Sequence, residues 1–141
     1  MRRSCCSRLF FVFLMLTGTL FALPQKSAIV YYAEDISYAN VGAHDYIIVE
    51  PDNISPYTHG FKTYKKKIYA YVSLGEIGSE RAYATQIKPE WKLSQNRLWN
   101  STVMDVSNDA YHAFIYDKVI QPLVDKGYKN LFFDPLDSYQ N

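Results

Sequence analysis

Three carboxylates in this sequence stand at or just beyond the ends of apolar runs. Glu50 ends "DYIIVE", Glu76 follows "YAYVSLG", and Asp134 ends "NLFFD". The carboxyl ends of parallel strands meet at one edge of a sheet, where α/β proteins bind their ligands. Acids gathered at such an edge repel one another and lose water, so that one can be protonated while another is ionised. The pattern therefore predicts acid–base chemistry at that edge.

Other polar side chains are expected on the same face of the sheet. Because side chains alternate along a strand, Tyr71 and Ser73 share one face of theirs. On the last strand Asp134 points to one face. Leu131 and Phe133 point to the other, where helices would cover them.

A simpler explanation is that acids after strands cap helices or solvate turns. That explanation suffices for one acid alone. Three acids at three strand ends favour a functional site, because function concentrates at strand ends.

The elements that must position these acids can be read from apolar runs and breaker residues. The near-continuous runs resemble strands covered on both faces of a parallel sheet. The predicted strands are residues 28–33, 45–51, 67–77 and 130–135, with a short extra strand at 102–106 and a weak helix at 54–64.

The strongest helix signal covers residues 107–129. Ser107 or Asn108 can cap its start, and Gly127 suits its end. Pro122 should remove a hydrogen bond and bend the axis. Strands alternating with helices indicate an α/β fold with parallel strands.

The segment from residue 78 to 100 is too long for a plain connector, and its length predicts a functional loop. It contains Trp91 and Trp99, which together with the 13 tyrosines could form stacking platforms for sugar rings. Any single tyrosine is better explained as part of a core.

The first residues have the pattern of a secretory signal peptide. The segment starts with three arginines and continues with an apolar run from Leu9 to Leu23. Ala22 stands at a possible cleavage point. We expect residues 1–22 to be a signal peptide and the protein to be secreted or periplasmic. The run is short for a membrane span, which needs about 20 residues. An uncleaved anchor is the alternative, and membrane contact would then be limited to this segment.

Charge and composition exclude several classes of function. The formal net charge is +1, but the first 25 residues hold three arginines and no acid, so the remainder carries −2. A remainder with this charge lacks the excess of positive charge that nucleic-acid binding requires. Cys5 and Cys6 also lie in that segment, and the three histidines lack metal-ligand spacing. The glycines of "SLGEIGS" lack the phosphate-binding pattern and a lysine, so no nucleotide partner is expected.

Five motifs occur in the order and spacing of a known family. "IVYYAED", "DYIIVEP", "YAYVSLGEIGSER", "VMDVSN" and "GYKNLFFDPLDSY" resemble glycoside hydrolase family 114, which is similar to endo-α-1,4-polygalactosaminidases. The resemblance runs from about Ile29 to Tyr139, and "YVSLGE" and "FFDPLDSY" are its most specific parts. The usual family form of the last motif is "LDTLDSY". Here Phe133 and Pro135 replace Leu and Thr, which leaves the acids in place.

This resemblance implies a (β/α)₈ TIM barrel in which a catalytic Asp closes the fourth strand, the position of Asp134. A barrel needs about 250 residues. Residues 29–141 are therefore expected to form only the first half of one, with the second catalytic acid missing from this chain. The implied chemistry needs neither a metal nor an organic cofactor. The residues then expected to bind the sugar are Glu50, Tyr71, Ser73, Glu76, Asp137 and Tyr139.

Two classes of function stay open, so whether the chain is an enzyme is undecided. The first is an exported glycosidase acting on a galactosamine-type polysaccharide, whose ammonium groups suit an acidic cleft. The second is a non-catalytic carbohydrate-binding protein or a truncated remnant of such an enzyme. An unrelated exported binding domain is a weaker third alternative.

Overall fold

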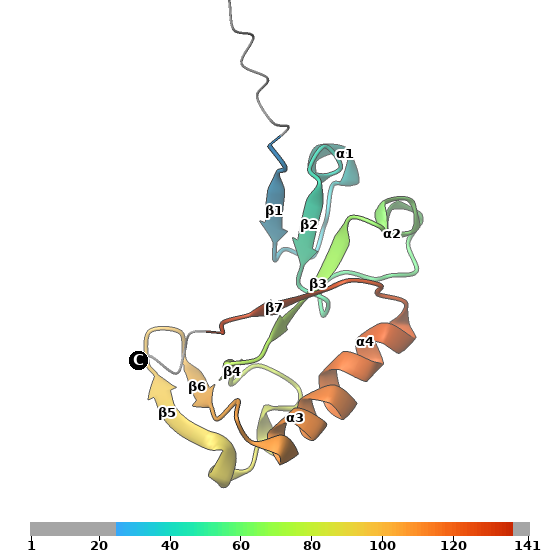
Figure 1. The fold of residues 1–141 in the computed structure, drawn as a ribbon. Coiled ribbons are helices and arrows are strands. Elements are labelled where there is room, and N and C mark those ends of the chain that lie inside the picture. Colours follow the sequence, from blue (N-terminus) through green and yellow to red (C-terminus); the bar gives the residue numbers. More distant parts are fainter. Residues whose placement is uncertain (1–24, 137–141) are drawn as a thin grey trace, which may run out of the picture.

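A parallel four-stranded sheet is the main element of the computed structural model, which describes residues 25–136 (Figure 1). Its strands are β1 (Ala28–Tyr31), β2 (Tyr46–Val49), β3 (Ile68–Ser73) and β7 (Leu131–Asp134). The order β1-β2-β3-β7 follows the sequence, and each neighbouring pair is parallel. The predicted α/β fold with parallel strands is confirmed.

One face of this sheet is covered by helices and forms the main core. Ile68, Ala70 and Val72 of β3 are buried there, while Tyr71 and Ser73 lie partly exposed on the opposite face. The expected alternation along β3 is therefore present. The core also includes residues of three helices, which are α1 (Tyr38–Val41), α2 (His59–Tyr64) and α4 (Gln121–Lys126). The single turn of α1 is too short to leave a periodic signal in the sequence.

The predicted long helix is present as two α-helical pieces joined by a π-helical turn. The pieces are α3 (Asp109–Ile115) and α4, and the turn is η3 (Tyr116–Ile120). Pro122 is the second residue of α4, one residue beyond the turn, and it has no N–H to donate to the residue four positions earlier. The wider turn accommodates this loss, so the bend predicted at Pro122 takes the form of a π-helical insertion.

Both ends of this helix follow the sequence signals. The Asn108 side chain accepts hydrogen bonds from the N–H groups of Ala110 and Tyr111, at 3.0 and 3.2 Å. Gly127 has φ of 109°, a left-handed conformation that costs little only for glycine.

The segment from residue 78 to 100, which was predicted to be a long functional loop, contains regular structure. It continues β4 (Glu76–Gly78), contains two 3₁₀ turns, η1 (Ala84–Gln86) and η2 (Pro89–Trp91), and then forms β5 (Lys92–Asn96). With β6 (Ser101–Met104) these strands make an antiparallel sheet of order β4-β6-β5, which lies beyond the carboxyl end of β3 (Figure 1). The polar sequence of β5 hid this strand, because most of its side chains are exposed and only its backbone is paired.

The second sheet has a core of its own, in which Trp91 is only 4% exposed. Ile77, Met104 and Tyr111 belong to the same cluster. Trp91 is therefore a packing residue, which corrects the expectation that it could be a sugar platform.

The outer strands of the four-stranded sheet are less covered than expected. Leu131 packs against the main core, but Phe133 on the same face of β7 is 40% exposed. Within the described residues, β1 and β7 each pair along one edge only. The expectation that helices cover Phe133 is therefore wrong for this part of the chain.

Three of the sequence expectations fall outside the described residues. These are the signal peptide at 1–22 and the site residues Asp137 and Tyr139. Between residues 25 and 136, no helix is both long and apolar enough to cross a membrane.

Candidate active site

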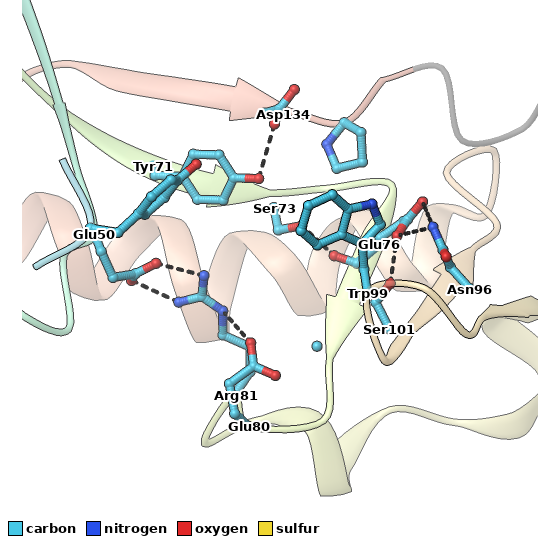
Figure 2. Close-up of a pocket in the computed structure, with 13 residues that line it drawn as sticks. Glu50, Tyr71, Ser73, Glu76, Glu80, Arg81, Asn96, Trp99, Ser101 and Asp134 are labelled. Atoms are coloured by element: carbon cyan, nitrogen blue, oxygen red, sulfur yellow. Dashed lines mark hydrogen bonds and ion pairs between the residues drawn. The ribbon is translucent and has the colours of Figure 1, made fainter. Parts of the chain in front are cut away.

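A cleft of about 670 Å³ lies at the carboxyl ends of the parallel strands, next to the second sheet. This volume falls in the range typical of ligand sites. Both sheets contribute to its lining, as Figure 2 shows. The lining residues are Tyr32, Glu50, Tyr71, Ser73, Glu76, Gly78, Glu80, Arg81, Asn96, Trp99, Ser101, Asp134 and Pro135.

The structure brings together every described residue that the sequence nominated for the site. Glu50, Tyr71, Ser73, Glu76 and Asp134 all line this cleft. Glu50 follows β2 directly, and Asp134 is the last residue of β7. Glu76 instead opens β4, beyond a turn that follows β3. Convergence of the strand ends thus places the acids around one cleft.

Asp134 is oriented by a neighbouring strand. Tyr71 on β3 donates a hydrogen bond from its hydroxyl to Oδ2 of Asp134, at 2.9 Å. Burial, and then this bond and the nearby carboxylate charge, raise the pKa of Tyr71 above its usual value. Tyr71 therefore stays a donor. Its ring is held edge-on by Tyr32, with the ring centroids 5.6 Å apart.

Glu50 does not present a free charge to the cleft. Its two carboxylate oxygens accept from the two terminal nitrogens of Arg81, both at 2.7 Å, as seen in Figure 2. Arg81 also lies 3.3 Å from Asp52 and 3.8 Å from Glu80. The hydrogen bonds to Glu50 raise the pKa of Arg81, so the guanidinium remains charged. The guanidinium of Arg81 therefore offsets the negative charge that Glu50 brings to the cleft.

Glu76 is tied to the hairpin formed by β5 and β6. Asn96 donates from Nδ2 to both carboxylate oxygens at 3.2 Å, and the Ser101 hydroxyl donates to Oε2. Glu76 is 9% exposed. In all of these contacts the carboxylate accepts, so Glu76 connects the two strands of the hairpin.

Sequence reasoning missed Arg81 and Asn96 as residues of the site, whereas it had named Trp99, which also lines the cleft, as a possible sugar platform. Arg81 was visible as a cation within the quoted motif "GEIGSER", but its partner Glu50 is 31 positions away. Asn96 and Trp99 belong to the hairpin that was expected to be a loop. No local pattern announces such contacts, because they arise only when the second sheet folds against the first.

Metal binding has no support among the side chains between residues 25 and 136. No group of three or more His, Cys, Asp or Glu side chains there could hold an ion.

The family follows from comparison of the sequence with known families. Residues 45–141 match the sequence model of glycoside-hydrolase family GH114. The chain belongs to family GH114. No curated protein matches this GH114 chain.

Solved structures show the same relationship. The glycoside hydrolase domain of PelA from Pseudomonas aeruginosa is 30% identical to the GH114 chain, with a TM-score of 0.65, and the match covers 81% of this chain and 46% of that domain's chain. The crystal structure of Aspergillus fumigatus Ega3 in complex with galactosamine has a TM-score of 0.66 at 17% identity, with coverage of 82% and 46%. The chain therefore spans about half the length of these structures. Its parallel sheet corresponds to part of a TIM barrel.

Proposed function

We propose that this GH114 chain is an exported glycoside hydrolase that acts on an amino-sugar polysaccharide of the α-1,4-polygalactosamine type. The observation that carries the proposal is the acidic cleft at the carboxyl ends of the strands, with Asp134 oriented by Tyr71. Family membership supports the reaction class. The galactosamine bound to Ega3 supports the sugar, on the premise that a shared fold keeps a related substrate.

The charge of the cleft suits a cationic sugar. Its lining holds four carboxylates and one guanidinium, and that guanidinium is paired with Glu50. The remaining acids, Glu76, Glu80 and Asp134, leave the cleft negative. A galactosamine polymer carries an ammonium group on each unprotected sugar, so the field of the cleft attracts it. An N-acetylated polymer lacks that charge and should bind more weakly.

The chemistry requires two carboxyl groups on opposite sides of the glycosidic bond. We assign the ionised role to Asp134, because Tyr71 donates to it and orients it for attack on the sugar or on a water molecule. The proton donor to the leaving oxygen is a separate group. The family resemblance implies that this group would come from a later strand of the barrel.

A reducing-end assay on soluble α-1,4-galactosamine oligomers tests this proposal. Any reducing ends that the unaltered chain releases should be lost in Asp134→Asn, because the amide can neither attack nor activate water. Asp117→Asn is the matched control, since Asp117 is exposed on η3 and lines none of the described cavities. Turnover retained in Asp134→Asn would overturn the assignment of Asp134.

A second candidate is carbohydrate binding without hydrolysis. The engagement of Glu76 by Asn96 and Ser101 favours it, because the oxygens of this acid are then occupied by donors of the hairpin. Calorimetric titration with the same oligomers separates the candidates. Binding without turnover supports the second, and absence of both contradicts both.

Export is proposed from the first 22 residues, whose basic start and apolar run fit a signal peptide. Expression in a secreting host should yield a protein beginning at Leu23, which intact mass will show. A secreted or membrane-bound product that retains residue 1 would contradict cleavage.

A further inference from the structure

Trp99 is a large aromatic side chain that is exposed at the cleft although its backbone is held. It lies in the turn between β5 and β6, lines the cleft and is 74% exposed. Figure 2 shows Trp99 among the residues of the cleft, whose lining also includes Glu76, Asn96 and Ser101. Because Trp99 lines the cleft, its exposed indole offers a broad apolar face to a ligand bound among the acids there.

The turn that carries Trp99 is braced on both sides. Before it, Asn96 accepts from the Leu98 N–H at 3.1 Å and donates to Glu76. After it, Asn100 adopts a φ of 50° and donates to the Ser79 hydroxyl at 2.8 Å. These contacts hold the backbone of the turn, and with it the point from which the indole projects.

Glu76 is the common anchor of this turn. Asn96 and Ser101, which flank the turn on β5 and β6, both donate to its carboxylate. Loss of the Glu76 carboxylate would release the side chains of Asn96 and Ser101 together. Glu76 can therefore act on a ligand through the position of Trp99 as well as through its own charge.

We propose that Trp99 is a sugar-stacking subsite at the mouth of the cleft and that Glu76 is the positioning residue that holds it there. The inference rests on the proposed function, because it assumes an amino sugar in the cleft. The indole face offers apolar area to the C–H face of a pyranose ring. It also attracts an ammonium group through its quadrupole.

Tryptophan fluorescence gives a direct test, because the chain has two tryptophans and Trp91 is buried in the second core. A soluble α-1,4-galactosamine oligomer added to the full chain should shift the emission to the blue and protect it from acrylamide quenching. The same titration of Trp99→Phe should leave the emission of the buried Trp91 unchanged.

Isothermal titration calorimetry on variants measures how much Trp99 contributes to the affinity for the oligomer. Trp99→Ala should weaken oligomer binding about 5- to 20-fold, and Trp99→Phe should restore part of the loss. Leu98→Ala is the matched control, because Leu98 is 84% exposed on the same turn and does not line the cleft. Its affinity should equal that of the unaltered chain.

A double-mutant cycle tests the role of Glu76. If Glu76 acts by positioning Trp99, the pair Glu76→Gln and Trp99→Ala should weaken binding no more than the larger single change. Independent, additive losses would overturn the positioning role. Far-ultraviolet circular dichroism confirms that each variant is folded.

The outcomes separate this inference from the proposed function. Oligomer binding that Trp99→Ala leaves unchanged would overturn the subsite while sparing the function. Failure of the unaltered chain to bind the oligomer would overturn the proposed sugar and the subsite with it.

Discussion

At the scale of single residues, the acids of the cleft differ in what they accept. Glu50 accepts from a guanidinium, Asp134 from a phenol, and Glu76 from an amide and a hydroxyl. A neighbouring cation offsets the negative charge of a carboxylate, whereas neutral donors orient the carboxylate and leave its charge in place. The cleft therefore keeps its negative field at Asp134 and Glu76, and loses it at Glu50.

Arg81→Met should lower the free energy of unfolding by about 2–4 kcal/mol, because it leaves the Glu50 carboxylate unpaired with its side chain 12% exposed. Urea denaturation followed by circular dichroism measures the change. The double variant Arg81→Met with Glu50→Gln should recover part of the loss. No recovery would show that the loss comes from packing of Arg81 and not from the unpaired charge.

Because of Tyr83, the free energy of unfolding should decrease as the pH rises above 10. Burial raises the pKa of its hydroxyl to about 12, from an ordinary 10.0. Below pH 10 the group is protonated in both states, so its contribution is fully present. Between pH 10 and pH 12 the unfolded chain releases the proton while the folded chain keeps it, and stability falls as pH rises.

Urea midpoints measured across this pH range test the expectation for Tyr83. Tyr83→Phe should give a smaller fall than the unaltered chain, with a residual slope from the other buried tyrosines. An identical slope in both proteins would contradict the assignment.

At the scale of elements, the second sheet and the capped helix hold the cleft in place. The hairpin of β5 and β6 supplies Asn96, Trp99 and Ser101, and α3 packs Tyr111 into the core beneath it. The Tyr111 hydroxyl also donates to the carbonyl of Leu74, at 2.6 Å. The residues between β3 and β4 are thereby tied to α3, so the stability of that helix bears on the rim of the cleft.

Asn108→Ala should cost about 1 kcal/mol of stability, because two N–H groups at the start of α3 lose their acceptor. Thermal or urea unfolding measures it. Asn108→Asp is the matched control, since its carboxylate can accept the same bonds and suits a helix N-terminus. A loss in Asn108→Asp as large as that in Asn108→Ala would contradict the capping role.

At the scale of the whole molecule, the described sheet has two strands that pair on one side only, β1 and β7. Apolar side chains are exposed along them, among them Val30 at 48% and Phe133 at 40%. Unpaired strand edges with apolar side chains template association. The 141-residue chain should therefore self-associate as its concentration rises.

Sedimentation velocity over a concentration series measures this association. Phe133→Lys should reduce it, because a charge on an edge strand opposes strand pairing. Tyr57→Lys makes a similar change at an exposed position away from both edges and should leave it unaltered. A chain that stays monomeric at every concentration would contradict the prediction.

Much of the fold was predictable because its signals are local. The apolar runs predicted the four parallel strands, Asn108 and Gly127 marked the ends of the long helix, and Pro122 marked its bend. Each of these signals acts through a residue's own backbone or its near neighbours in sequence. The convergence of Glu50, Glu76 and Asp134 was also predictable, since parallel strands in sequence order place their carboxyl ends together.

The partners of those acids were decided only by the tertiary structure. Arg81 reaches Glu50 across 31 positions, and Tyr71 reaches Asp134 across 63. Which of the two tryptophans is available to a sugar was likewise decided by packing, because the second core buries Trp91 and leaves Trp99 exposed. The sequence determined which chemical groups stand at the strand ends. The folding of a polar hairpin against the parallel sheet decided which of them are paired, because such contacts depend on distances in space that no local pattern encodes.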